Sequence, residues 1–365
     1  MTRAMRMICL LAFIVLLTGA AVGADAQSTS APAAANPPQQ AAAPRQQTPP
    51  SIIIRTQVVV VPVTVKDGRG QLVGDLQKED FRVFSDGIEQ KVTQFSAEPV
   101  PLSAVVLLDN DLAERPGKQL QASLSTIAAG FGPTDEVALV TYDQYPETVA
   151  DFSSDNDQLY TQLKRLELGT HNTQVIADPT TAGPLINGQP APSTQGPAIH
   201  GSQRYKADIA LNDAVFAAAG MLKARGSNRR KIIFLISDES NSGPNAHSYE
   251  ETLHALLIND VSVYSISLIH TIPIGRSLVQ RGASDIDKLV ADAGGDKYFA
   301  DKQDELDRLY SDVTEEARNQ YTLTFSPGEL QGGQDYHSIE VRVRRPGLTV
   351  DTREGFYLSA VGAGR

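Results

Sequence analysis

The sequence predicts an α/β protein with a mostly parallel central sheet, flanked by a small β module that the N- and C-terminal strands build together. Two apolar runs, Leu102–Leu108 and Lys231–Ser237, suit strands that are buried on both faces, as in a parallel sheet covered by helices. Strands and helical patterns alternate around these runs, which indicates crossover connections. β-branched segments stand before and after this region, and they predict the module.

The N-terminal β segment, residues 51–99, is rich in strand signals. The expected strands are 52–65, 81–84 and 90–95. Glycines mark a turn at 66–70, and Ser85-Asp86-Gly87 is typical of a hairpin turn. A module of this size is too small to be stable alone, so we expect it to pack on another element.

The central region, residues 100–320, alternates between the two kinds of element. We expect helices at 116–131, 156–166, 207–224, 249–259, 285–293 and 304–320, and further strands at 136–142, 148–152, 261–268 and 298–299. The C-terminal β segment, residues 321–360, should form strands at 321–325, 338–344 and 348–352. The simplest packing joins it with 51–99 on the side of the core away from the ligand edge. Residues 170–205 form a long Gly-, Pro- and Thr-rich insertion, which we expect to be either flexible or an ordered recognition loop.

The N-terminal 26 residues have the pattern of a signal peptide. Arg3 and Arg6 precede a short apolar run, and Ala24-Asp25-Ala26 is a cleavage signal before Gln27. An uncleaved anchor is the alternative, whereas no other integral membrane segment is expected. Residues 27–50 are rich in Ala, Pro and Gln and predict a disordered linker. We therefore expect a secreted protein, or one in the periplasm or cell envelope.

The formal net charge of −11 argues against a nucleic-acid partner, which requires a basic surface. Acidic residues instead follow the two buried strands. Asp109 and Asp111 come after the first, and Asp238 comes after the second. In an open α/β sheet these ends meet at the ligand-binding edge. Such a cluster suits Mg²⁺ or Ca²⁺, or else each Asp caps the loop or helix that follows it.

Several stretches together resemble the von Willebrand factor type A domain, over roughly residues 100–320. More specifically, the chain resembles the exported acidobacterial von Willebrand factor A-related family. The matching stretches are 61–65, 80–87, 100–109, 211–215, 236–238, 293–295, 320–325 and 353–357. The resemblance implies a Rossmann-like core with a metal-ion-dependent adhesion site at the sheet edge.

The usual adhesion site of this family is Asp-x-Ser-x-Ser, a Thr from a middle loop and a later Asp. Carried over, the two Asp positions are Asp109 and Asp238, while Asp111 replaces the first Ser. Ala113 and Ile209 stand where the second Ser and the Thr are expected, so three hydroxyl positions depart from the pattern and two of them cannot ligate a metal through a side chain. The resemblance therefore implies a degenerate site. Either three aspartates hold Mg²⁺ or Ca²⁺ with waters, or the ion is lost and recognition has moved to the loops.

The loops at this edge are the expected partner contacts. They contribute Asn110, Thr170, Thr173, Glu239 and Ser240, and the two threonines could supply a substitute hydroxyl. The histidines lack zinc-helix spacing, and no Gly-x-Ser-x-Gly elbow is present. We therefore expect a non-enzymatic, adhesion-type module that recognises a protein partner. The alternative is a structural cell-envelope scaffold with an idle metal site.

Overall fold

The structure is a computed structural model. It describes residues 58–169, 209–268, 285–300, 302–327 and 335–358, and it also gives the backbone of four short strands. These strands are β8 (Leu185–Ile186), β9 (Gln189–Pro190), β12 (Thr271–Ile274) and β13 (Ser277–Gln280). The contacts group residues 55–365 into one unit, and the description concerns that unit. The predicted signal peptide, the linker and most of the 170–205 insertion lie outside the described residues.

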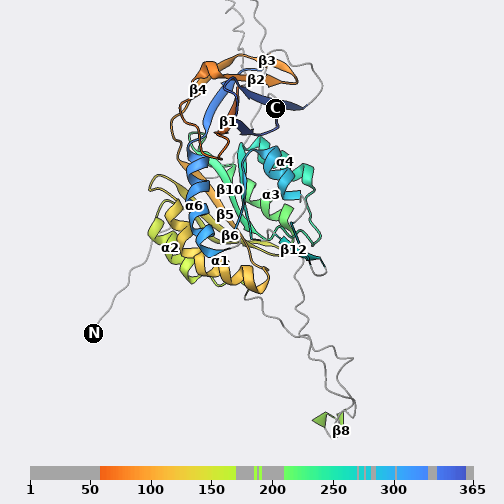
Figure 1. Cartoon of the computed structure of the whole chain (residues 1–365). Helices are drawn as coiled ribbons and strands as arrows, with labels where there is room; N and C mark the ends of the chain where they lie inside the picture. Colours follow the sequence, from red (N-terminus) through yellow and green to blue (C-terminus); the bar gives the residue numbers. More distant parts are fainter. Residues whose placement is uncertain are drawn as a thin grey trace, which may run out of the picture. The chain divides into compact units, whose positions relative to one another are not determined.

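A six-stranded sheet forms the core, in the order β14-β11-β10-β5-β6-β7 (Figure 1). Its strands are β5 (Leu102–Asp109), β6 (Glu136–Tyr142), β7 (Pro146–Ser153), β10 (Arg230–Ser237), β11 (Val261–Ser267) and β14 (Lys297–Phe299). All pairings are parallel except that of the edge strand β7 with β6. In chain order this is the 3-2-1-4-5-6 arrangement of doubly wound folds. The predicted fold class is confirmed.

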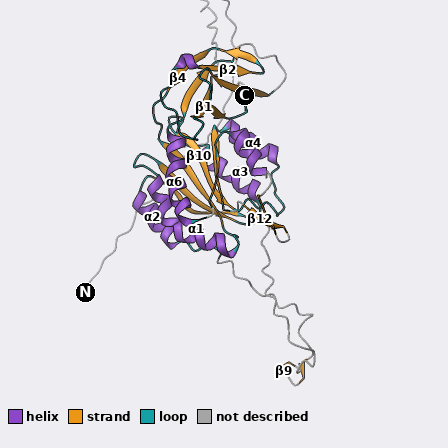
Figure 2. Cartoon of the chain, in the orientation of Figure 1, coloured by secondary structure: helices purple, strands orange, loops and turns teal. Residues whose placement is uncertain are grey.

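Helices cover both faces of this sheet (Figure 2). On one face, α1 (Glu114–Ile127), α2 (Asn156–Arg165) and α6 (Gln303–Arg318) pack on Ala104 and Val106 of β5. On the other, α3 (Leu211–Leu222), α4 (Tyr249–Ile258) and α5 (Asp285–Ala293) pack on Val105 and Leu107. Successive residues of a strand point to opposite faces, so an unbroken apolar run fills both cores.

The β module is a sandwich of two four-stranded sheets, β17-β1-β15-β4 and β18-β16-β2-β3. Its strands are β1 (Val59–Lys66), β2 (Phe81–Ser85), β3 (Ile88–Gln90), β4 (Val92–Ser96), β15 (Tyr321–Phe325), β16 (Tyr336–Val343), β17 (Thr349–Thr352) and β18 (Gly355–Tyr357). A third core fills the space between the sheets, with Val63 and Leu323 from one and Val83 and Val341 from the other. The N- and C-terminal strands thus build one module, as predicted.

The expected single return strand at 90–95 is wrong. Strand β3 pairs with β2 in one sheet, whereas β4 pairs with β15 in the other. The chain changes sheets at the exposed Lys91, after which Val92 is buried in the sandwich core. Alternation alone does not reveal such a crossing, because the pattern suits either partner. The predicted turn is present, and both Asp86 and Gly87 have the positive φ that two-residue hairpins require.

The module contacts the edge of the parallel sheet where the strands begin, opposite Asp109. Arg230 is the first residue of β10 and is buried, and its guanidinium donates to the Gln320 carbonyl (3.3 Å) and to Thr322 Oγ1 (3.1 Å). The Gln320 amide donates to Thr64 Oγ1 on β1 at 3.0 Å. Burial lowers the pKa of Arg230 to about 10. The junction is therefore a buried polar network that specifies how the module docks.

A buried ion pair at this junction yields a stability prediction. Lys66 Nζ lies 2.7 Å from the Glu316 carboxylate, whose side chain is 4% exposed, and it also contacts Asp296. Burial raises the pKa of Glu316, and the Lys66 charge opposes that rise. Lys66→Met removes the counter-charge and leaves a buried carboxylate, so we expect a loss of about 3 kcal/mol in the free energy of unfolding. Urea denaturation at pH 7 measures it.

The matched control is Lys118→Met. Lys118 pairs with Glu114 on the exposed face of α1, with 76% of its side chain exposed. Exposed pairs of this kind contribute little, so no comparable loss is expected. Equal losses in the two variants would contradict the role assigned to Lys66.

Among the described residues, none of the helices combines the length and the apolar character that a membrane span needs.

Candidate functional site

The candidate site lies where β5 and β10 end side by side. These neighbouring parallel strands are the first and fourth of the sheet, so the connections leave them in opposite directions. Such a switch point leaves a crevice at the carboxyl ends of the strands, which is where ligands bind in this class of fold. The structure brings Asp109 and Asp238 together here: the Asp238 N–H points to Asp109 Oδ2 at 3.5 Å.

Asp109 is fully buried and has an altered acidity. Its Oδ1 accepts the Asp111 N–H at 3.0 Å. Burial, and then the negative charge of Asp238, raise the pKa of Asp109 to about 7, against the opposing effect of the two N–H donors. At neutral pH this carboxyl therefore carries a proton about half of the time. The charge on Asp109 therefore depends on pH around neutrality.

The donor set does not fit the usual adhesion site. Ala113 is the N-cap residue of α1, and Ile209 is 1% exposed and packs in the core, so neither supplies an oxygen from its side chain. Asp238 Oδ1 already accepts the Ser240 N–H at 2.9 Å. Within the described part of the chain, no three acidic, His or Cys side chains are grouped so as to hold a metal. The structure brings Asp109 and Asp238 together, while Asp111 contacts Asp109 through its backbone N–H.

Glu239 faces inward, although the sequence suggested a partner contact. Its backbone has φ +62°, a left-handed conformation that is unfavourable outside glycine, and its side chain is 0% exposed. The carboxylate lies 2.6 Å from Lys297 Nζ, which also contacts Asp287 at 2.5 Å. Glu239 therefore holds the loop after β10 against β14 and α5. It does not belong to the exposed contact surface.

Asn110 connects three parts of the edge. Its N–H donates to the Tyr142 carbonyl at 2.8 Å, and its Oδ1 accepts the N–H of Gly169 at 3.0 Å. Gly169 is the last described residue before the long insertion, so this bond ties the end of the segment after α2 to the end of β5. Thr170 and Thr173 lie outside the described residues.

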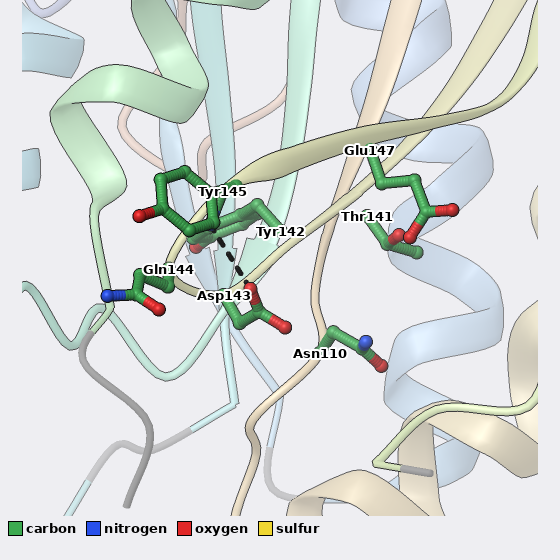
Figure 3. A pocket seen from close by; sticks show the side chains of 7 residues that line it. All are labelled: Asn110, Thr141, Tyr142, Asp143, Gln144, Tyr145 and Glu147. Carbon is green, nitrogen blue, oxygen red and sulfur yellow. Dashed lines mark hydrogen bonds between the residues drawn. The ribbon is translucent and has the colours of Figure 1, made fainter. Parts of the chain in front are cut away.

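A pocket of about 440 Å³ opens beside Asn110 (Figure 3). Its walls come from the end of β6, the β6–β7 turn and the start of β7. The lining residues are Asn110, Thr141, Tyr142, Asp143, Gln144, Tyr145 and Glu147. Tyr145 is 71% exposed at the mouth, and its N–H donates to Asp143 Oδ1 at 3.1 Å. Sequence reasoning missed this pocket. The available signal was an aromatic residue beside a proline in a short turn between two strands.

The pocket has an acidic character. Asp143 and Glu147 line it, and it has no basic lining residue. Tyr142 is 1% exposed, and its hydroxyl makes no hydrogen bond of ordinary geometry although Ser237 is near. Burial, and then the charge of Asp109, raise the pKa of Tyr142 well above its usual range. The pocket is thus lined by acidic and aromatic residues, and one of them, Tyr142, lies close enough to Asp109 to be affected by its charge.

The fold and site define a class: a Rossmann-like core with acidic residues at the switch point. This is the fold that the resemblance in the sequence implies. No protein-family model matches the chain, and no curated protein matches it.

Solved structures do match. A von Willebrand factor type A protein from Catenulispora acidiphila is 8% identical, over 84% of this chain and 76% of its own, with a TM-score of 0.42. The conserved hypothetical protein BatB from Bacteroides thetaiotaomicron is 13% identical, over 59% and 98%, with a TM-score of 0.38. A mussel byssus thread matrix protein, solved with zinc in its adhesion motif, is 12% identical, over 64% and 49%, with a TM-score of 0.39. At such identities, function has to be argued from the residues of this chain.

Proposed function

We propose that this chain is a non-enzymatic binding module that recognises a protein partner at the carboxyl edge of its sheet. The partner presents a basic side chain to the pocket beside Asn110. The observation that carries the proposal is the pocket itself, which an exposed aromatic residue, Tyr145, lines together with Asp143 and Glu147. Aromatic anchors surrounded by polar groups are typical of protein interfaces.

The proposal reverses the charge of the usual adhesion site. In that site a cation recruits an acidic side chain, whereas here Asp109 and Asp238 supply negative charge with no hydroxyl ligands from Ala113 or Ile209. The edge then attracts a Lys or Arg directly. A tyrosine ring at the mouth adds a face on which a cation can lie. In this proposal Mg²⁺ or Ca²⁺ is not needed for recognition.

The location of the module is also part of the proposal. The signal peptide pattern supports export and cleavage near Ala26–Gln27, to the periplasm, the cell envelope or the medium. The Ala-, Pro- and Gln-rich residues 27–50 then act as a spacer, which lets the edge reach a partner at some distance.

A photo-crosslinking experiment tests the edge. A photoreactive phenylalanine analogue at position 145 is expected to crosslink one partner species in envelope extracts, because Tyr145 stands at the pocket mouth. The same analogue at position 160 is the control, since Tyr160 is also exposed (45%) but lies on α2. Mass spectrometry of the crosslinked peptide identifies the partner and should locate a Lys or Arg beside the attachment point.

Crosslinking that is equal at both positions, or absent at 145, would contradict recognition at this edge. A purified partner then allows a sharper comparison. Glu147→Gln is expected to weaken binding about tenfold, in line with the loss of one charge pair at an interface. If binding maps to the β module instead, the scaffold alternative is favoured.

A further inference from the structure

A second pocket lies on the β module. It has a volume of about 300 Å³ and is formed by the 3-10 turn at Lys78–Asp80, the β2–β3 hairpin and the residue that follows β16. Its charged lining residues are Lys78, Glu79, Arg82, Glu89, Lys91 and Arg344, and we call it the basic pocket. Four cations and two carboxylates leave an excess of positive charge in a chain whose net charge is −11.

The charges in the basic pocket divide into a paired set and an available set. Arg82 is held by Glu89 through two hydrogen bonds, of 2.8 and 2.6 Å. Lys78, Lys91 and Arg344 form no ion pair with the described residues. The Arg82–Glu89 pair therefore forms one wall. Of the other three cations, Lys91 and Arg344 are exposed and Lys78 is half-buried.

The arginines on either side of Arg344 differ from it, because each of them forms an ion pair. Arg342 and Arg345 neighbour Arg344, yet each has its own acid: Arg342 binds Glu340 at 2.5 and 2.9 Å, and Arg345 binds Asp75 at 2.8 Å. Both lie outside the basic pocket. Of these three neighbouring arginines, only Arg344 lines the basic pocket, and it is the one without an ion pair among the described residues.

The backbone under the basic pocket is well connected. The Arg344 N–H donates to the Asp80 carbonyl at 2.9 Å, and the Gln77 N–H donates to Asp80 Oδ2 at 2.8 Å. These bonds join the end of β16 to the turn that carries Lys78. Two lysines and an arginine are thus presented from elements that are joined by hydrogen bonds.

We infer that the basic pocket binds a phosphate dianion. The guanidinium of Arg344 suits two oxygens of one phosphate, and the ammonium groups of Lys78 and Lys91 add point charges around it. A dianion balances the excess charge of the lining, because Arg82 and Glu89 already neutralise each other. The volume suits one small anionic group. The basic pocket shares no lining residue with the sheet-edge pocket, so this inference does not depend on the proposed function.

Two sources present this group: free phosphate, and a phosphate monoester at a lipid surface. Isothermal titration of the purified chain with inorganic phosphate, against sodium chloride at matched ionic strength, tests the first. Sedimentation with vesicles that contain phosphatidate, against vesicles of neutral lipid, tests the second. We expect saturable binding in at least one arm, and the arm identifies the source.

The test variant is the double change Lys91→Gln and Arg344→Gln, in which both residues are exposed. Binding is expected to fall at least tenfold. The control is Arg342→Gln, which removes a cation from the same strand outside the basic pocket and should leave binding unchanged. Circular dichroism melting verifies that all variants are folded. No binding in either arm, or equal losses in the double variant and the control, overturns the inference.

Discussion

Gly295→Ala is expected to prevent stable folding. A Cβ atom at this position would lie 2.0 Å from the Val263 carbonyl oxygen and 2.7 Å from its carbonyl carbon, both of them backbone atoms of β11. To avoid this clash, β14 must move away from β11. That movement breaks the β11–β14 pairing, which begins at Ser265 and Lys297, and displaces the strand that lies beside the Glu239 loop. We expect a loss of more than about 4 kcal/mol, which is a large share of the stability of an ordinary domain.

The matched control is Gly220→Ala. Gly220 lies on the exposed side of α3, and a Cβ there meets nothing within 4 Å. Alanine is the better helix former, so this variant is expected to gain up to about 1 kcal/mol. Thermal melting of the two variants side by side should give changes of opposite sign. A Gly295→Ala protein that melts within a few degrees of the parent would show that the β11–β14 contact is not tight.

Asp109→Asn is expected to flatten the pH dependence of stability between about pH 4 and pH 7. The folded pKa of Asp109 is about 7, against an ordinary value of 3.8. The folded chain therefore holds this proton more tightly than the unfolded chain, and stability falls as the pH rises through this window. The gap corresponds to about 4 kcal/mol. Asparagine cannot ionise, and its Oδ1 keeps one of the two N–H contacts.

Urea denaturation at a series of pH values measures this effect. Asp312→Asn on α6 serves as the control, because Asp312 is half-exposed and, among the described residues, forms its ion pair with Arg308 in the same helix. Its profile should follow that of the parent. A parent whose stability rises steadily from pH 4 to pH 7, or an Asp109→Asn profile parallel to it, would count against the buried carboxyl pair. A basic partner should also bind more tightly above pH 7, where Asp109 is charged.

Much of the fold can be predicted from the sequence, because the positions that become buried carry apolar residues in a recognisable pattern. The run Leu102–Leu108 is apolar at every position except Ser103, and the structure buries it on both faces. Asp109, which follows that run, also marks the candidate ligand edge, because the order of the strands reverses direction between β5 and β10. The hairpin turn at Asp86 and Gly87 could also be predicted, because both residue types tolerate the positive φ that such a turn requires.

The remainder depends on contacts that local patterns do not record. Val92 alternates correctly for a hairpin with β2, yet it pairs with Phe325, far along the chain. Glu239 looks like an exposed acid until its positive φ turns it toward Lys297. Tyr145 is one more aromatic residue in sequence, and only the geometry of the β6–β7 turn leaves it exposed beside Asn110. The chemistry of the site therefore depends on where the fold places these residues, which their types alone do not reveal.

The sandwich has a consequence for how the chain is made. Gln320 meets Thr64 across a separation of 256 residues, and β1 is flanked on both sides by strands from the C-terminal end. Strand β1 is synthesised long before its two hydrogen-bonding neighbours, β15 and β17. Until then it is an unpaired, β-branched strand of the kind that associates with other chains. The α/β core has to form first and bring the ends together, so we expect slow completion of folding and a dependence on chaperones that shield β1 in the meantime.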